Sequence, residues 1–94
     1  MAALDLLGRR WVLRILWEMR EGTVGFRALQ QRCDDMSSSV LRDRLHELRD
    51  AGIVTSDAGT YELSALGIEL LAALGPLWNW TARWDAALSR RRRR

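Results

Sequence analysis

The stretch from residue 37 to residue 63 constrains the fold more than any other part of this chain. Ser37 is a favourable N-cap residue, and three leucines follow it on one face of a helix, at spacings of three and four: Leu41, Leu45 and Leu48. Gly52 ends this pattern, because glycine readily takes the backbone conformation that closes a helix. The sequence therefore predicts a capped amphipathic helix that stops at a defined point.

Two short strand patterns follow this helix directly, at residues 53–56 and 60–63. The segment between them, Asp57-Ala58-Gly59, is typical of a tight turn, because Gly59 can take a positive φ. A β-hairpin is predicted here.

The N-terminal part predicts two more helices. Over residues 4–20 the apolar side chains recur at spacings of three and four, with Gly8 as a candidate break: Leu4, Leu7, Trp11, Ile15 and Met19. Gly22 is a C-cap signal, and residues 23–25 can pair as a small edge strand. A second helix is expected from about residue 26 to residue 33, with Phe26 and Leu29 inside.

The C-terminal part predicts one long helix capped by Ser64. Its apolar residues are Leu66, Leu70, Leu71, Leu74, Leu77, Trp78, Trp80 and Trp84. Because Pro76 lies inside this pattern, we expect a kink or a break near Leu74 and Gly75. The Arg run at residues 90–94 is expected to be a disordered tail.

The order helix, short strand, helix, capped turn, helix, hairpin, helix is that of a winged helix-turn-helix. We therefore predict a mainly α fold with a small β-hairpin (α+β), with a three-helix core, a short wing and a long C-terminal helix. The 94 residues suit a single domain, predicted at residues 1–89, in which the C-terminal helix serves dimerisation.

The net charge of +3 is not by itself an argument for nucleic-acid binding. All 15 basic residues are Arg, and five of them form the run at residues 90–94. Without this run, ten basic residues stand against twelve acidic ones, a net charge of −2. DNA binding must therefore be argued from the local placement of charges.

Several function classes are disfavoured by the composition. A single cysteine, Cys33, cannot form an internal disulfide, and with a single histidine the chain has no Cys/His cluster at metal-ligand spacing. We expect no cofactor, and Cys33 is interpreted as a small apolar core residue. His46 has no recognisable nucleophile partner, so an enzyme is not expected. Apolar stretches are interrupted well before about 20 residues, so we predict no membrane span and a cytoplasmic, nucleoid-associated protein.

The helix after Ser37 carries the candidate DNA contacts. At 100° per residue, Ser39, Asp43, His46 and Asp50 point away from the leucine face, and Arg42 and Arg49 lie on one flank. The exposed first turns suit the major groove, where free backbone N–H groups meet phosphates and Arg42 reaches a guanine edge. The candidate DNA-binding residues are Arg27, Arg32, Ser37, Ser38, Ser39, Arg42, Asp43, Arg44, His46 and Arg49. A solvated helix face without a ligand is the alternative interpretation.

Three segments together resemble the HxlR-type branch of the MarR-like winged-helix regulators. They are LDLLGRRW at residues 4–11, VLRDRLHEL at 40–48 running into AGIV at 51–54, and YELS at 61–64 with Leu66 and Gly67. The resemblance implies a dimeric bacterial transcription factor whose first and last helices form the dimer and whose third helix binds DNA. By matched position it places Ser38, Ser39, Arg42, Asp43 and Arg44 in the recognition segment.

The chain departs from the family pattern in two ways. Redox-sensing relatives often carry a cysteine upstream of the first segment, whereas Cys33 falls elsewhere. The wing at residues 56–60 is short and contains no Arg, so minor-groove contact by the wing is expected to be weak. The Arg tail then becomes a candidate for following phosphates or a narrow minor groove.

The five Trp residues together have more aromatic surface area than a single small domain can bury. We predict a homodimer interface formed by Leu4, Leu7, Trp11, Leu77, Trp80 and Trp84, with a purely intramolecular core as the alternative. An aromatic-lined pocket for an unidentified small-molecule effector is compatible with the same helices. The rival interpretation keeps the fold but makes it a protein–protein interaction module that does not read DNA; the acidic residues Asp43, Glu47 and Asp50 favour it.

Overall fold

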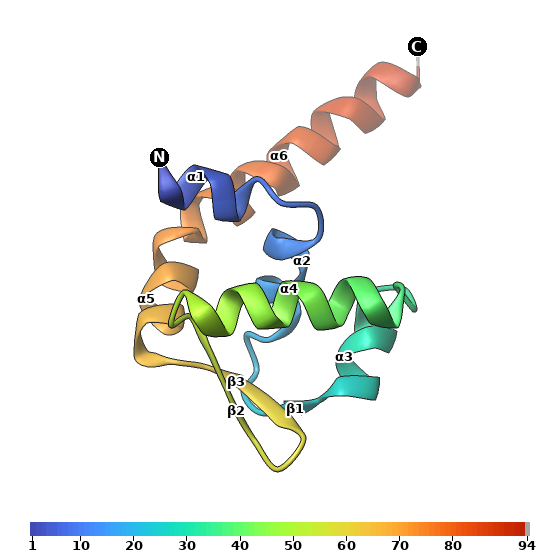
Figure 1. Ribbon diagram of the computed structural model, residues 1–94. Helices are drawn as coiled ribbons and strands as arrows, with labels where there is room; N and C mark the ends of the chain where they lie inside the picture. Colours follow the sequence, from blue (N-terminus) through green and yellow to red (C-terminus); the bar gives the residue numbers. More distant parts are fainter. Residues whose placement is uncertain (94) are drawn as a thin grey trace.

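Six helices and a small three-stranded antiparallel sheet make up the computed structural model, which describes residues 1–93, and the sheet lies at one edge of the helices (Figure 1). In chain order the elements are α1 (Ala2–Leu7), α2 (Val12–Glu18), β1 (Val24–Gly25), α3 (Phe26–Arg32), α4 (Ser38–Asp50), β2 (Val54–Asp57), β3 (Thr60–Leu63), α5 (Ala65–Ala73) and α6 (Gly75–Arg92). This is the predicted winged helix-turn-helix, with α3 and α4 as the helix-turn-helix pair and the β2–β3 hairpin as the wing.

The first predicted helix is two helices in the structure, so the continuous helix over residues 4–20 is corrected, while the candidate break at Gly8 is confirmed. Gly8 ends α1, and Trp11 takes a left-handed conformation (φ 79°) before α2 begins. This reversal allows Leu7 and Trp11 to pack against the core. Helical periodicity cannot show such a break, because the apolar spacing continues through it.

The hydrophobic core lies between α2, α3, α4 and the sheet. Its buried members are Val12, Ile15, Leu16, Met19, Val24, Leu29, Cys33, Met36, Leu41, Leu45, Leu48 and Val54. Phe26 is only partly buried and packs against this set. The predicted leucine face of α4 is therefore confirmed.

The sheet has the strand order β1-β3-β2, with Val24 opposite Tyr61 and Val54 opposite Leu63. The two-residue turn at Ala58 (φ 49°) and Gly59 (φ 85°) joins the wing strands. Both turn residues have positive φ, as a tight hairpin with right-handed strand twist requires. The predicted edge strand and hairpin are both confirmed.

The C-terminal segment breaks where Pro76 predicts it, at Leu74 between α5 and α6. Pro76 sits in the first turn of α6, where its missing N–H costs no helical hydrogen bond. Ser64 caps α5 by accepting from the Gly67 N–H at 3.1 Å. The predicted start and break of this helical segment are thus correct.

The end of α6 differs from the prediction of a disordered tail, because Arg90, Arg91 and Arg92 continue the helix; Arg94 lies outside the described residues. Arginine is a good helix former, and cations near a helix C-terminus interact favourably with its dipole. Figure 1 shows α6 extending away from the rest of the chain, with its C-terminal end opposite the wing. None of the helices in residues 1–93 is long and apolar enough to cross a membrane.

Candidate nucleic-acid interface

Helix α4 is fixed from below by its leucines and from its start by Ser37. Leu41, Leu45 and Leu48 are at most 2% exposed, so this face is fully committed to the core. The Ser37 side chain accepts from the Val40 N–H at 3.4 Å and contacts the Ser39 hydroxyl at 2.9 Å. The helix is therefore held at a fixed rotation about its axis, which determines which of its residues face outward.

The turn between α3 and α4 is held by backbone and side-chain hydrogen bonds. Asp34 (φ 57°) and Asp35 (φ 56°) both take the left-handed conformation that aspartate tolerates better than most residues. The Asp35 N–H donates to the Gln30 carbonyl at 3.0 Å, and Gln30 Nε2 donates to the Met36 carbonyl at 2.8 Å. Buried Met36 completes the turn, so the start of α4 is tied to the end of α3.

The outward face of the first two turns of α4 is open. Ser38, Ser39, Arg42 and Asp43 are all exposed. The Arg42 guanidinium lies 5.0 Å from the centroid of the Phe26 ring in α3. An arginine held against an aromatic ring keeps its donors free while losing side-chain freedom, which favours a directed contact. The sequence did not single out Phe26 for this role.

Phe26 in turn packs on the wing, with its ring 6.5 Å from that of Tyr61 in β3. Arg42, Phe26 and Tyr61 thus connect α4, α3 and β3 in one row. The open face of α4 and the wing are therefore linked through the Phe26 ring.

The second half of α4 faces a groove beside β2. His46 Nε2 lies 3.2 Å from an Asp50 carboxylate oxygen one turn later, and both side chains are exposed. The groove has a volume of about 420 Å³ and is lined by His46, Arg49, Asp50, Val54, Thr55 and Ser56. Thr55 and Ser56, which the sequence analysis did not select, bring hydroxyl groups next to Arg49.

Three of the arginines predicted to bind DNA differ in their contacts with the rest of the protein. Arg27 is exposed and makes no ion pair within residues 1–93. Arg32 is exposed but donates to the Glu18 carbonyl at 3.2 Å. Arg44 is partly buried: its Nε donates to the Arg10 carbonyl at 2.9 Å and its Nη1 lies 3.2 Å from Glu47. This side chain ties α4 to the loop after α1, and its contact with DNA stays a prediction.

The wing contains acidic side chains and no basic ones. Asp57 and Glu62 are the charged residues of residues 54–63, and Thr60 Oγ1 donates to the Asp57 carbonyl at 2.8 Å. A negative hairpin tip is repelled by the phosphates of a minor groove. Weak contact of the wing with DNA therefore stays a prediction.

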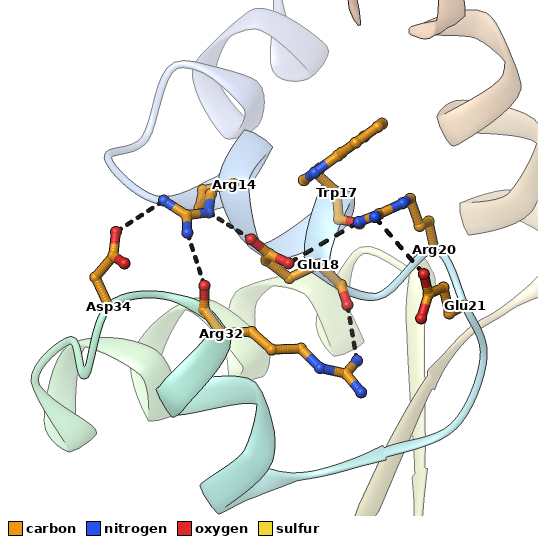
Figure 2. A network of polar contacts seen from close by, with 7 residues as sticks. All are labelled: Arg14, Trp17, Glu18, Arg20, Glu21, Arg32 and Asp34. Atoms are coloured by element: carbon orange, nitrogen blue, oxygen red, sulfur yellow. Dashed lines mark hydrogen bonds and ion pairs between the residues drawn. The ribbon is translucent and has the colours of Figure 1, made fainter.

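A polar network that sequence reasoning missed joins α2 to the helix-turn-helix (Figure 2). Arg14 donates to Glu18 at 2.7 Å, to Asp34 at 3.1 Å and to the Arg32 carbonyl at 2.7 Å. The hydrogen bond to Glu18 is the main reason that the pKa of Arg14 is raised. The Arg14–Glu18 spacing of four was a visible signal for a helical pair, whereas the contact with Asp34 arises only from the fold.

Cys33 lies in the core at 0% exposure, at the end of α3. Burial raises the pKa of its thiol to about 11. A protonated, inaccessible thiol is a poor nucleophile, which agrees with interpreting Cys33 as a core residue.

The predicted dimer residues fall into two groups. Leu7 and Trp11 are partly buried against the chain's own core, while Leu77 is half-buried on α6. Leu4, Trp80 and Trp84 are 64%, 48% and 50% exposed, and the two indole rings stack at 5.6 Å. The second group therefore consists of exposed apolar side chains that the rest of the described chain does not cover: Leu4 on α1 and the stacked Trp80–Trp84 pair on α6.

Comparison with known proteins assigns the chain to one family. Residues 6–89 match the model of the HxlR-like helix-turn-helix family. An uncharacterized HTH-type transcriptional regulator of Methanocaldococcus jannaschii is 29% identical over 91 residues, covering 93% of this chain and 86% of that protein.

Two solved structures have the same fold over almost their full length. The crystal structure of quinone-bound YodB from B. subtilis has a TM-score of 0.80 at 28% identity, over 87% of this chain and 93% of that one. That of a possible HxlR family transcriptional factor from Thermoplasma volcanium has a TM-score of 0.80 at 26% identity, over 92% and 84%. The chain therefore belongs to the HxlR-like helix-turn-helix family of DNA-binding transcriptional regulators, which are MarR-like winged-helix proteins.

Proposed function

We propose that this regulator binds duplex DNA sequence-specifically as a homodimer, with α4 of each protomer in the major groove. The observation that carries the proposal is the division of α4 into a fully buried leucine face and an open face with Arg42 at its centre. An arginine on such a face can donate two hydrogen bonds to the O6 and N7 of guanine.

The remaining residues of the outward face have supporting roles. The hydroxyls of Ser38 and Ser39 and the free N–H groups of the first turn of α4 are placed for phosphate contacts. Arg27 at the start of α3 and Arg49 beside the wing are the exposed cations on either side. We assign base reading to Arg42 and phosphate binding to Arg27 and Arg49.

A homodimer accounts for the apolar surface of Leu4, Trp80 and Trp84. Large stacked aromatics are favoured at subunit interfaces and are unfavourable in water. Two recognition helices related by a two-fold axis would bind half-sites about one helical turn, roughly 34 Å, apart. The Arg run at the end of α6 lies opposite the wing, so we do not assign it a contact with the DNA bound by its own α4 (Figure 1).

The test is a titration of a fluorescent duplex from the gene's own promoter region at two salt concentrations. Arg42→Ala should weaken specific binding by about 1–3 kcal/mol and reduce the preference over a scrambled duplex. Arg83→Ala, which removes an exposed arginine of α6, is the matched control and should keep that preference.

Equal affinity of the wild type for the promoter and the scrambled duplex would contradict sequence-specific binding. It would favour the protein–protein interaction module. Sedimentation velocity tests the dimer separately, and Trp80→Ala with Trp84→Ala should shift the population towards monomer. An unchanged sedimentation coefficient would contradict this assignment of the interface.

A further inference from the structure

Helix α4 contains three acidic residues whose charge by itself opposes DNA binding: Asp43, Glu47 and Asp50. A carboxylate that faces a duplex is repelled by the phosphates unless a cation or a hydrogen-bond donor lies next to it. The contacts that each carboxylate makes within the protein therefore decide how it bears on the proposed function.

Two of the three acidic residues already have a basic side chain beside them. Glu47 Oε1 lies 3.2 Å from Arg44 Nη1, and Glu47 Oε2 lies 3.8 Å from Arg9 Nε. A carboxylate oxygen of Asp50 lies 3.2 Å from His46 Nε2. Both carboxylates therefore have a partner within the protein before DNA binds.

Asp43 differs from the other two. Its side chain is exposed and makes no hydrogen bond or ion pair with another residue of the described range 1–93. At 100° per residue it points almost directly away from the buried Leu41 and Leu45. When α4 lies in the major groove, the Asp43 carboxylate therefore faces the edges of the bases.

The major groove offers few partners to a carboxylate. Guanine and thymine present acceptors there, O6 and N7 or O4, which repel it. Adenine presents the N6 amino group next to the acceptor N7, so one carboxylate oxygen is attracted while the other is repelled. Cytosine presents the N4 amino group without an acceptor beside it. Cytosine is therefore the base that suits this carboxylate.

Arg42, the residue before Asp43, limits where this cytosine can lie. Its guanidinium is held 5.0 Å from the centroid of the Phe26 ring. Consecutive Cα atoms are about 3.8 Å apart, and successive base pairs are about 3.4 Å apart, so neighbouring residues of a helix reach bases within about two steps. The cytosine should therefore lie within about two base pairs of the guanine contacted by Arg42.

We propose that Asp43 is a specificity-determining residue, which accepts a hydrogen bond from the N4 amino group of a cytosine in each half-site. This deepens the function proposed above and rests on it. The same carboxylate lowers the affinity for duplexes with another base at this place, because it then faces acceptors and phosphates without a donor. The acidic side chain on α4 thus increases discrimination at the cost of affinity for non-specific DNA.

The base preference is tested by selecting duplexes from a library with a randomised centre, using the full chain of the wild type and of Asp43→Asn. The wild type should select cytosine at one position of each half-site, with a preference of about fivefold or more in titrations of single-base variants. Asp43→Asn should select adenine there, because an amide accepts from N6 and donates to N7. A purely structural role of Asp43 would not exchange one base for another at one position.

The repulsion is tested with Asp43→Ala and a control of equal charge. Asp43→Ala should lose the preference at this position and bind a scrambled duplex about threefold or more tightly. Asp85→Ala removes an exposed carboxylate from α6 and changes the net charge by the same amount. It should keep the cytosine preference and bind the scrambled duplex almost as the wild type does. Circular dichroism establishes that each variant is folded.

The proposal is overturned if Asp43→Asn selects the same bases as the wild type, or if Asp43→Ala keeps the cytosine preference. It is also overturned if Asp85→Ala raises the affinity for the scrambled duplex as much as Asp43→Ala, since net charge alone would then explain the gain. A wild type that selects no sequence would overturn the proposed function as well. If selection is lost in Arg42→Ala but unchanged in both Asp43 variants, the proposed function stands and the role of Asp43 alone is wrong.

Discussion

The helix-turn-helix half and the terminal helices of this protein are built in opposite ways. Every buried apolar side chain in residues 1–93 belongs to residues 12–54, the part that contains α2, β1, α3, α4 and the start of β2. Helices α1 and α6 have no buried residue, and α5 contributes only Gly67. The exposed large apolar residues are Met1, which precedes α1, and five residues of the terminal helices: Leu4, Leu66, Ile68, Trp80 and Trp84.

Apolar residues therefore have different roles in the two regions. In the first region they fix the rotation of α4 and so decide which side chains face outward. In the second region they remain exposed and can pack against another molecule, which we propose is a partner subunit. The first region should therefore respond to mutation through the free energy of unfolding, and the second through association.

Comparing Leu45→Ala with Leu66→Ala is the most direct test of this difference between the two regions. Leu45 is 2% exposed, and its truncation should lower the free energy of unfolding by about 2–5 kcal/mol through lost burial and a residual cavity. Leu66 is 58% exposed, and the same truncation should change it by no more than about 0.5 kcal/mol. Urea unfolding followed by circular dichroism measures both, and equal losses would contradict the division.

Gly67→Ala tests a close contact between α5 and the first region. A Cβ at Gly67 would collide with the Ile53 carbonyl oxygen and press on Leu63. We expect a loss of about 1–3 kcal/mol in the free energy of unfolding. Gly75→Ala is the control, because a Cβ there meets nothing and alanine favours a helix. Thermal unfolding of both variants decides, and a stable Gly67→Ala protein would show that α5 is free to shift.

Ser64→Ala should have a smaller effect at the same junction. Ser64 Oγ donates to the Gly52 carbonyl at 2.5 Å and caps α5 through the Gly67 N–H. Its removal should cost about 1 kcal/mol, as for other N-caps. Ser89→Ala, in the exposed part of α6, should be neutral by the same unfolding measurement. A loss at Ser89 as large as that at Ser64 would contradict the assigned role of the cap.

The sequence predicted the elements whose signals are local. The cap at Ser37, the leucine face of α4, the hairpin turn and the break near Pro76 each follow from residue type and spacing, and each is confirmed. The segment 4–20 is two helices: Gly8 was a visible signal for the break, whereas the left-handed Trp11 leaves no mark on the apolar spacing. The helical end of α6 was missed because an Arg run has no periodic pattern.

The candidate site was predicted less completely, because its contacts join distant parts of the chain. Exposure of Ser38, Ser39 and Arg42 follows from the helix alone. The ring of Phe26 beneath Arg42 and the engagement of Arg44 by the Arg10 carbonyl depend on how α3 and α1 approach α4. No spacing within one segment encodes such contacts.

Cys33 gives an effect that appears only at alkaline pH, and it tests how tightly the first region is closed. Burial raises the thiol pKa from 9.0 to about 11, so between these values only the unfolded chain ionises at Cys33. Below pH 9 this thiol has no influence on stability, and as the pH rises towards 11 the free energy of unfolding falls, because the unfolded state has lost a proton that the folded state keeps. Cys33→Ala removes this contribution, so the decline with pH above 9 should be shallower in the variant than in the wild type when both are unfolded in urea. In parallel, a thiol-specific reagent at pH 8 should react with Cys33 only in unfolded protein. Rapid reaction of the native thiol would mean that the end of α3 opens readily, and the contrast between a closed helix-turn-helix and open terminal helices would then no longer hold.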